Sequence, residues 1–187
     1  MPTVGVLALQ GDFREHLKVL ERLGCKTRPV RTRDDLEQVE AIIIPGGEST
    51  TIGKLSVRFG IFEPLRNRIE AGLPTFGTCA GMIFLAANVT EGHQPLLGSL
   101  DVVVERNAFG RQNDSFEADL DINGFDRPFP AVFIRAPWVA KMGNGVEVLA
   151  TIDGHPVMVR QGRVLASSFH PELTGDDRIH SMFIGSI

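Results

Sequence analysis

A cysteine on a short turn between a strand and a helix is the feature that most constrains this chain. Residues 73–76 form an apolar run typical of a buried strand, and residues 82–87 follow a helical pattern. Between them lies the G-x-C-x-G sequence Gly77-Thr78-Cys79-Ala80-Gly81. A sharp strand–turn–helix connection of this kind is typical of α/β proteins and presents its central side chain at the end of a strand. The sequence therefore predicts an α/β fold with Cys79 at such a turn.

The first half of the chain alternates apolar runs with helical patterns. Strands are predicted at residues 3–9, 27–31 and 41–44, and helices at 13–23, 52–59 and 62–71. In the first helix, Asp12 and Glu15 have capping-box spacing, and one face carries Phe13, Leu17, Leu20 and Leu23. Strands that alternate with helices imply βαβ units and a mostly parallel sheet covered on both faces.

The second half contains mainly strand patterns. Strands are predicted at residues 100–105, 131–135, 146–152, 156–160 and 164–169, with a tight hairpin turn at Asp153-Gly154. These strands are expected to be antiparallel additions that extend the sheet. At 187 residues, with no linker and no internal repeat, the chain is expected to form one domain spanning residues 1–187.

Charge and cysteine usage exclude several classes of protein. The net charge is −4 and there is no basic block, so we expect neither nucleic acid nor a membrane as partner. No secretory signal and no membrane-spanning run is recognisable, which predicts a cytoplasmic protein. Two cysteines make no disulfide framework, and no cysteine or histidine pair has zinc-ligand spacing, so no metal site is expected.

Cys79 is the candidate nucleophile. A thiol attacks as the thiolate, and a helix N-terminus favours that negative charge. Gly77 and Gly81 provide the space that a tight turn needs. The alternative role is that of a small buried apolar residue, which is the role we expect for Cys25.

His170-Pro171-Glu172 supplies a candidate base and a carboxylate. On a strand, His170 and Glu172 would share one face, so the carboxylate could bind one ring nitrogen and leave the other for the sulfur. Alone, the tripeptide would indicate only a turn at the end of a strand. The remaining histidines are expected to be ordinary surface or helix residues; they are His16, His93, His155 and His180.

An acyl-transfer site also needs N–H donors for the developing oxyanion. The amide of Ala80, directly after the cysteine, is one candidate, and the Gly46-Gly47 turn after the strand at residues 41–44 is the other, through Gly47. That turn also fits a plain strand-to-helix connection with Ser49 or Thr50 as the helix cap. It has neither the spacing nor the lysine of a phosphate-binding loop.

Taken together, these motifs resemble the class I (triad) glutamine amidotransferases. More narrowly, the chain is similar to the glutaminase subunits of pyridoxal 5′-phosphate synthase, and this resemblance runs from residue 3 to past residue 175. The narrower likeness rests on the GVLALQG sequence at residues 5–11, PGGESTT at 45–51, ERNAFGRQ at 105–112 and DSFE at 114–117. The resemblance also leads us to expect a longer C-terminal helix than the residues before Ile187 allow.

The resemblance implies a flavodoxin-like, three-layer α/β fold and hydrolysis of L-glutamine to L-glutamate and ammonia through a cysteinyl thioester, without a cofactor. It assigns Cys79, His170 and Glu172 as the triad. It assigns contacts with glutamine to Gly47, Glu48, Ser49, Arg106, Ile134 and Arg135. It also implies that ammonia passes to a (β/α)8-barrel synthase subunit in a large hetero-oligomer that makes pyridoxal 5′-phosphate.

Three alternatives remain open at this stage. The chain could be the glutaminase of another synthase, such as one that makes histidine or a purine, although the motif at residues 105–112 argues against it. It could be a cysteine peptidase or a DJ-1-like protein on a similar fold. It could be a non-catalytic binding subunit, which would have no need of the three triad residues.

Overall fold

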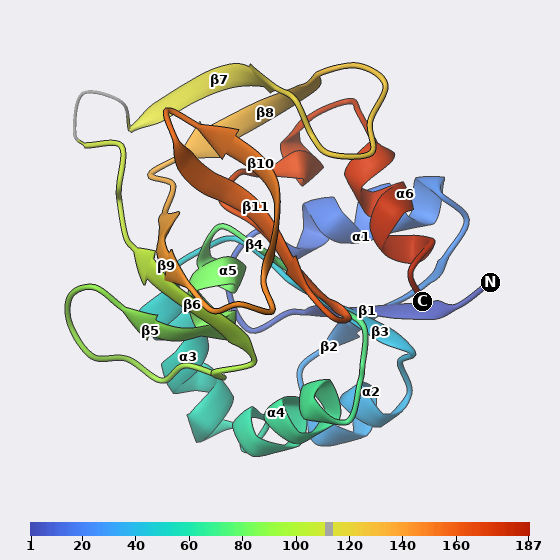
Figure 1. Ribbon diagram of the computed structural model, residues 1–187. Coiled ribbons are helices and arrows are strands. Elements are labelled where there is room, and N and C mark those ends of the chain that lie inside the picture. The colour runs from blue at the N-terminus through green and yellow to red at the C-terminus, as the bar shows by residue number, and fades with distance from the viewer. Residues whose placement is uncertain (111–113) are drawn as a thin grey trace.

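A computed structural model describes residues 1–110 and 114–187, so Arg111 and Gln112 of the motif at 105–112 lie outside the described residues. Figure 1 shows a twisted central sheet with helices on both sides and smaller sheets beside it. The central sheet has seven strands in the order β10-β11-β12-β4-β3-β1-β2.

Five strands of the central sheet run parallel. Their order in space, β2-β1-β3-β4-β12, follows the 2-1-3-4-5 pattern of flavodoxin-like folds, which confirms the predicted fold class. The bounds of these strands are β1 (Thr3–Leu7), β2 (Lys26–Val30), β3 (Ala41–Ile44), β4 (Thr75–Thr78) and β12 (Val164–Ser167).

The antiparallel hairpin of β10 (Glu147–Ile152) and β11 (His155–Gln161) extends the sheet beside β12. Its turn has Asp153 at φ 49° and Gly154 at φ 80°, which confirms the predicted tight turn.

Helices cover both faces of the sheet. On β3, Ala41 and Ile43 join one hydrophobic cluster, and Ile42 and Ile44 join the other, because alternate residues of a strand face opposite sides. One cluster includes residues of α1 (Phe13–Arg22) and α6 (Arg178–Ile184). The other includes residues of α2 (Arg33–Glu37), α3 (Ser49–Arg58), α4 (Phe62–Glu70) and α5 (Ala80–Leu85). The fold therefore has three layers.

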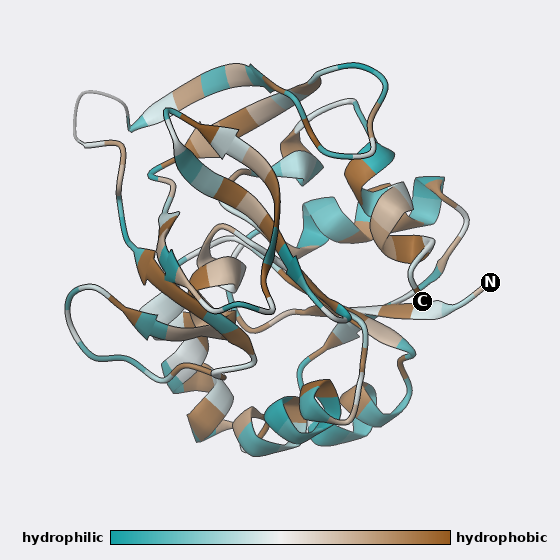
Figure 2. Ribbon diagram, viewed as in Figure 1, coloured by the Kyte–Doolittle hydropathy of each residue, from teal (hydrophilic) through white to brown (hydrophobic). Residues whose placement is uncertain are grey.

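Not every predicted strand of the second half joins the central sheet. The strands β6 (Leu100–Glu105) and β8 (Phe129–Ile134) pair elsewhere, so the expectation that they extend it is wrong. The strand β6 forms a three-stranded sheet with β5 (Ala86–Val89) and β9 (Trp138–Met142). The strand β8 pairs with β7 (Ser115–Leu120). Figure 2 shows hydrophobic and hydrophilic residues alternating along β7, as expected for a strand with one covered face.

Helix α1 differs from its prediction in two ways. Asp12 is the residue before the helix, but its side chain makes no capping hydrogen bond, so the capping box is wrong. The buried face consists of His16, Val19 and Leu20, whereas Phe13 and Leu17 are half-buried at its border. A histidine therefore occupies the centre of the face that packs on the sheet.

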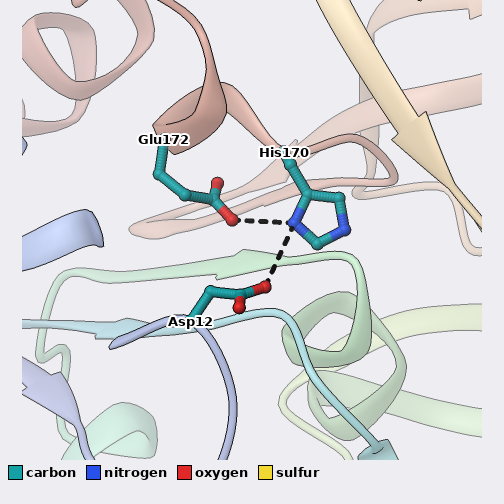
Figure 3. Close-up of side chains that lie close together, drawn as sticks. All are labelled: Asp12, His170 and Glu172. Atoms are coloured by element: carbon teal, nitrogen blue, oxygen red, sulfur yellow. Dashed lines mark hydrogen bonds and ion pairs between the residues drawn. The ribbon is translucent and has the colours of Figure 1, made fainter. Parts of the chain in front are cut away.

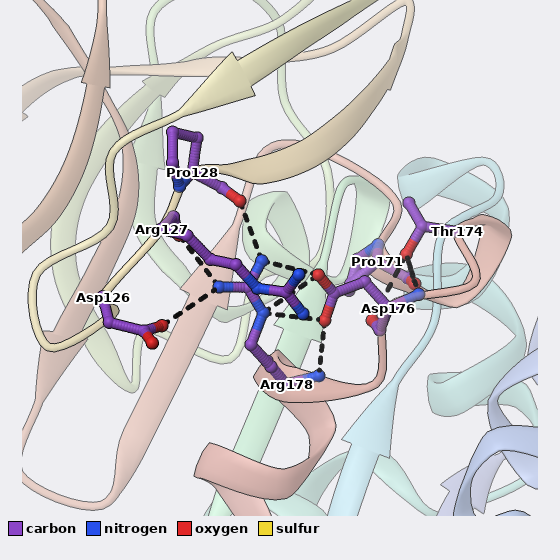
Figure 4. A network of polar contacts seen from close by, with 7 residues as sticks. All are labelled: Asp126, Arg127, Pro128, Pro171, Thr174, Asp176 and Arg178. Carbon is purple, nitrogen blue, oxygen red and sulfur yellow. Dashed lines mark hydrogen bonds and ion pairs between the residues drawn. The ribbon is translucent and has the colours of Figure 1, made fainter.

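The segment between β12 and α6 is held by Arg178. Its guanidinium donates to the carbonyl oxygens of Arg127 and Pro128, each at 2.8 Å, and to the carboxylate of Asp176 at 2.9 Å (Figure 4). Thr174 Oγ1 donates to the carbonyl of Pro171 at 3.0 Å. This network ties the chain that follows His170 to the loop that leads into β8.

Within the described ranges, no helix has both the length and the apolar character needed to span a bilayer.

Candidate active site

A cavity of about 320 Å³ opens at the carboxyl ends of the parallel strands. Ligands of open α/β sheets bind at this edge, because the loops after the strands converge there. Fourteen residues line it: Gln10, Gly11, Asp12, Gly47, Glu48, Ser49, Cys79, Ala80, Ile83, Arg106, Asn107, Ile134, Arg135 and His170. All predicted site residues except Glu172 are therefore brought to one cavity.

Cys79 lies on a strained turn between β4 and α5. Its φ of 48° is positive, which is uncommon for a residue with a side chain, and its N–H donates to the carbonyl of Ser167 on β12 at 2.8 Å. A β-carbon on Gly81 would collide with the carbonyl of Ile44, and one on Gly77 would lie 2.7 Å from the carbonyl of Gly81. Both glycines are thus required by close packing, which confirms the reason for the G-x-C-x-G spacing.

His170 and Glu172 form a buried hydrogen-bonded pair. His170 Nδ1 and Glu172 Oε1 are 2.7 Å apart, and the other ring nitrogen faces away from the carboxylate (Figure 3). The N–H of His170 donates to the carbonyl of Val132 on β8 at 2.8 Å, which fixes the backbone. This geometry lets Nδ1–H donate to Glu172 and leaves Nε2 on the other side of the ring to hold the proton of the Cys79 thiol.

The expectation that His170 and Glu172 share one face of a strand is wrong. The strand β12 ends at Ser167, and Pro171 begins a short 3-10 helix, η2 (Pro171–Leu173). Proline suits the first position of a helix because its missing N–H would have no helical partner there. The tight turn, rather than alternation along a strand, brings Glu172 to the histidine ring.

The charges of the pair stabilise each other. Burial lowers the pKa of His170, but Cys79 and Glu172 outweigh this effect and raise the pKa of His170 to about 10. Burial raises the pKa of Glu172, but His16 and His170 outweigh it, so the pKa of this carboxyl falls below its ordinary value. Glu172 is therefore an anion at neutral pH and a strong partner for a histidine that takes up a proton.

The loop after β3 is held from two sides. The carbonyl of Gly46 accepts from the N–H of Asp12 at 3.0 Å, and the side-chain oxygen of Gln10 accepts from the N–H of Glu48 at 2.8 Å. Gly47 has φ 151°, and a β-carbon there would collide with Gln10. The two glycines thus allow this loop to lie close to the residues that follow β1.

Glu48, not Ser49 or Thr50, caps helix α3. Its carboxylate accepts from the N–H groups of Thr50 and Thr51 at 3.2 and 2.8 Å. The Glu48 carboxylate is the cap because it accepts from two N–H groups at once. The Ser49 hydroxyl instead donates to the side-chain oxygen of Gln94 at 3.2 Å. The expected cap was wrong by one or two residues.

Two arginines stand at the cavity wall. Arg106 Nη2 lies 3.3 Å from Glu48 Oε1, and both side chains are partly exposed. Arg135 is exposed and has φ 44°, and the preceding carbonyl of Ile134 lies 3.8 Å from the Cys79 sulfur. The cavity thus offers two cations, one of them already paired with a carboxylate.

Sequence reasoning missed five lining residues as site residues: Gln10, Gly11, Asp12, Ile83 and Asn107. The first three follow β1 directly, so the rule that sites form at the carboxyl ends of parallel strands would have found them. Asp12 Oδ2 lies 3.8 Å from His170 Nδ1 (Figure 3).

Of the remaining histidines, His16 and His180 are helix residues, as expected, but neither is at the surface. His16 and His180 are fully buried and in contact with each other. His93 is exposed, and His155 stacks on Trp138 with ring centroids 3.6 Å apart. Cys25 is buried in the core, as predicted.

Asp12, His170 and Glu172 offer atoms of metal-ligand type within 4.8 Å of one another. One of these atoms, His170 Nδ1, already shares a proton with Glu172 at 2.7 Å, so a metal there would displace the hydrogen bond that orients the histidine. The expectation of no metal stays a prediction.

Comparison with known proteins places this geometry in a family. Residues 6–187 match the SNO glutamine amidotransferase family. The chain belongs to this family. It is 60% identical over 182 residues to "Pyridoxal 5'-phosphate synthase subunit PdxT" of Pelotomaculum thermopropionicum, which covers 97% of this chain and 93% of that one. It is 55% identical over 191 residues to the protein of the same name in Mycolicibacterium vanbaalenii, with 100% and 98% covered.

Solved structures agree with this assignment. A crystal structure of a glutamine amidotransferase is 57% identical and superposes with a TM-score of 0.94, covering 98% of this chain and 97% of that one. The structure of PurLQS from Thermotoga maritima superposes with a TM-score of 0.66 at 18% identity, covering 100% of this chain and 98% of that one. The second likeness supports the fold alone.

Proposed function

We propose that residues 1–187 form one glutaminase domain that hydrolyses L-glutamine for a pyridoxal 5′-phosphate synthase. The observation that carries this proposal is the His170–Glu172 pair, hydrogen-bonded at 2.7 Å, whose histidine lines the cavity that also holds the strained Cys79 turn. Full-length relatives named as subunits of that synthase support the choice of pathway.

The reaction that fits these residues is a thioester mechanism. His170 takes the proton of the Cys79 thiol, and the thiolate bonds to the side-chain amide carbon of glutamine. The protonated His170 then gives its proton to the departing nitrogen, which leaves as ammonia. Water, deprotonated by the same histidine, cleaves the thioester and releases glutamate. Glu172 keeps the imidazole in one orientation and stabilises its cation throughout.

Backbone amides would hold the oxyanion of the two tetrahedral intermediates. The N–H of Ala80 is a free first-turn donor of α5, and the N–H of Gly47 comes from the facing loop. Preset donors of this kind lower the barrier because the charge develops where they already point.

The amino-acid end of glutamine is matched by the charges at the cavity wall. Arg106 or Arg135 can bind the α-carboxylate, and Glu48 can accept from the α-ammonium group. Ser49 and Ile134 complete the contacts with the side chain. Arg106 and Glu48, now 3.3 Å apart, would then separate, so that Arg106 binds the α-carboxylate of glutamine and Glu48 binds its α-ammonium group.

The ammonia acceptor is proposed to be a (β/α)8-barrel synthase subunit, with both subunits in a large hetero-oligomer in the cytoplasm. Free hydrolysis would waste glutamine, so a glutaminase of this kind is useful only beside an acceptor. The reduced, buried cysteines Cys25 and Cys79 suit a reducing compartment.

The deciding experiment is ammonia release from glutamine by the complex with its synthase subunit, for the native chain and for Cys79→Ser. We expect Cys79→Ser to lose more than about 99% of the activity, because a hydroxyl is a far weaker nucleophile than a thiolate. Its melting temperature should stay within about 2 °C of the native value, since the volume change is small. Retention of more than a few per cent of activity would remove Cys79 from its role.

Covalent labelling supplies an independent control. A glutamine-mimicking electrophile should add one mass at Cys79 and none at Cys25, because burial raises the pKa of the Cys25 thiol. Labelling centred on Cys25 would contradict the site assignment.

A further inference from the structure

Two buried histidines lie directly behind the triad carboxylate, outside the cavity. His16 comes from α1 and His180 from α6, and neither is exposed to solvent. His16 Nδ1 lies 2.9 Å from His180 Nε2, and His16 Nε2 lies 3.1 Å from Thr78 Oγ1 and 3.4 Å from Glu172 Oε2. A line of polar side chains therefore runs from α6 through α1 to Glu172 and on to His170.

The burial of this line restricts where its protons lie. Burial lowers the pKa of both His16 and His180, so both rings are neutral and each carries one N–H. If His16 carried its proton on Nδ1, its Nε2 lone pair would face the Glu172 carboxylate. His180 would then hold its proton on Nδ1, an atom with no hydrogen-bond partner among the described residues. An unpartnered buried donor and two facing lone pairs both cost free energy.

The opposite arrangement removes the facing lone pairs and leaves His180 Nδ1, within the described residues, as an unpartnered acceptor instead of an unpartnered N–H donor. His180 donates from Nε2 to Nδ1 of His16, and His16 donates from Nε2 toward Thr78 Oγ1 and Glu172 Oε2. Glu172 Oε2 forms no hydrogen bond in the described part of the chain, and His16 Nε2 lies beside it at 3.4 Å, while Oε1 binds His170. Each carboxylate oxygen is then directed at one histidine.

We propose that His16 is a positioning residue of the triad: its Nε2–H holds the second oxygen of Glu172, and His180 fixes the tautomer of His16 that makes this possible. This inference rests on the proposed function, since it assigns His16 a role through Glu172 and His170. His16 touches neither the cavity nor the substrate, so its effect is on the carboxylate alone.

The groups around Glu172 define what the loss of His16 would do. His170 precedes it on the same turn, and Cys79 lies beyond His170. His16 approaches from α1, and Asp12 from the residue before that helix. His180 lies behind His16. Without His16, a deeply buried carboxylate loses one of its two polar partners. Its protonation then becomes easier, and a protonated Glu172 no longer stabilises the His170 cation.

The test uses the complex with the synthase subunit and compares His16→Leu with His16→Gln. Leucine removes the donor, whereas the glutamine amide can place an N–H close to the position of Nε2. For His16→Leu we expect kcat to fall about 10- to 100-fold, as for the loss of a hydrogen bond to a charged group, with KM for glutamine within about twofold. The acidic limb of the kcat/KM profile should move up by about one pH unit or more, and His16→Gln should restore most of both.

A matched control separates positioning from packing. Leu20→Ala removes a fully buried side chain from the same helix face, so it should lower stability without moving the acidic limb. A native pH profile and native kcat in His16→Leu, with the native complex active, would overturn this inference and leave the proposed function intact. An inactive native complex would instead count against the proposed function.

One measurement needs no variant. Nitrogen-15 NMR of histidine-labelled native chain distinguishes the two neutral tautomers and the cation. We expect His16 to be the Nε2–H tautomer from about pH 6 to pH 8. A His16 protonated on Nδ1, or doubly protonated, in this range would also overturn the inference, even if the leucine variant fails to fold.

Discussion

Gly46 and His170 are in such close contact that only a hydrogen atom fits between the glycine Cα and the imidazole ring. A β-carbon on Gly46 would lie 2.9 Å from Nδ1 of His170 and closer still to Cε1. The loop after β3 therefore forms one wall of the slot that holds the base, although it comes from a distant part of the chain.

Gly46→Ala is expected to displace the His170 ring and disturb its hydrogen bond with Glu172. A shift of about 1 Å in a catalytic group costs about 100-fold in rate, so kcat of the complex should fall by that order. Gly175→Ala is the control, because a β-carbon there meets no atom within 4 Å. Steady-state kinetics of both variants measure this effect on kcat. An unchanged kcat in Gly46→Ala would show that the added β-carbon does not displace the His170 ring.

His170→Asn and Glu172→Gln should differ in severity. Loss of His170 removes the base, and we expect kcat to fall by about 10⁴-fold or more; loss of the Glu172 charge removes only the orientation and stabilisation of the cation, so its cost should be smaller. Single-turnover ammonia release by the complex measures both. The reverse order would mean that Glu172, not His170, handles the proton.

Arg106→Ala should weaken glutamine binding. If Arg106 meets the α-carboxylate, KM should rise about 10- to 100-fold, the range for a hydrogen bond between charged groups, with a smaller change in kcat. Arg33→Ala, which removes an exposed arginine paired with Glu37 on α2, is the control and should leave KM unchanged. A native KM and a native kcat in Arg106→Ala would show that Arg106 is a surface charge that does not bind glutamine.

The buried His180 should make the fold sensitive to acid. Burial, with help from His16, lowers the pKa of His180 to about 3, whereas in the unfolded chain it is about 6.5. Between these values the unfolded state binds a proton that the native state does not. The free energy of unfolding should therefore fall with decreasing pH, and His180 contributes about 1.4 kcal/mol per pH unit to that slope.

Urea unfolding between pH 4.5 and pH 6 measures this slope. His180→Gln removes the titrating group and should reduce the slope by about that amount, whereas His93→Gln, at an exposed histidine, should not. Equal slopes for the native chain and His180→Gln would show that His180 takes up its proton in the folded state.

Activity should depend on the synthase subunit. The Gly46–Gly47 peptide has glycine on both sides, and among the described residues its carbonyl accepts from the N–H of Asp12, so a docked partner can change its orientation at low cost. We expect the isolated chain to hydrolyse glutamine weakly or not at all, and the partner to raise the rate at least about tenfold, which needs a shift of only about 1.4 kcal/mol. Full activity of the isolated chain would contradict this coupling.

The same complex tests where the ammonia goes. With Cys79→Ser, pyridoxal 5′-phosphate synthesis should stop with glutamine and resume with added ammonium salt, because only the ammonia supply is lost. If the assembled complex stays inactive with ammonium, the role of this chain as ammonia donor is wrong.

The local sequence determined much of the fold and the outline of the site. The wholly apolar residues 41–44 became β3, Asp153-Gly154 became a hairpin turn, and the G-x-C-x-G spacing became the strained turn at Cys79. These features depend on neighbouring residues only, since apolar runs, positive φ angles and missing side chains act within a few positions. The family motifs added the pairing of Cys79 with His170 and Glu172.

Only the tertiary structure decided which distant segments meet. Sheet order places β12 beside β4, and so brings His170 to Cys79, while the loop after β1 supplies Gln10 and Asp12 to the same cavity. His16 lies on a helix face that its sequence describes only as half apolar, and its burial against His180 follows from packing α1 and α6 on one side of the sheet. Hydrophobic periodicity predicts which face of a helix is covered. The three-dimensional packing of the chain determines which residues contact a polar side chain on that face.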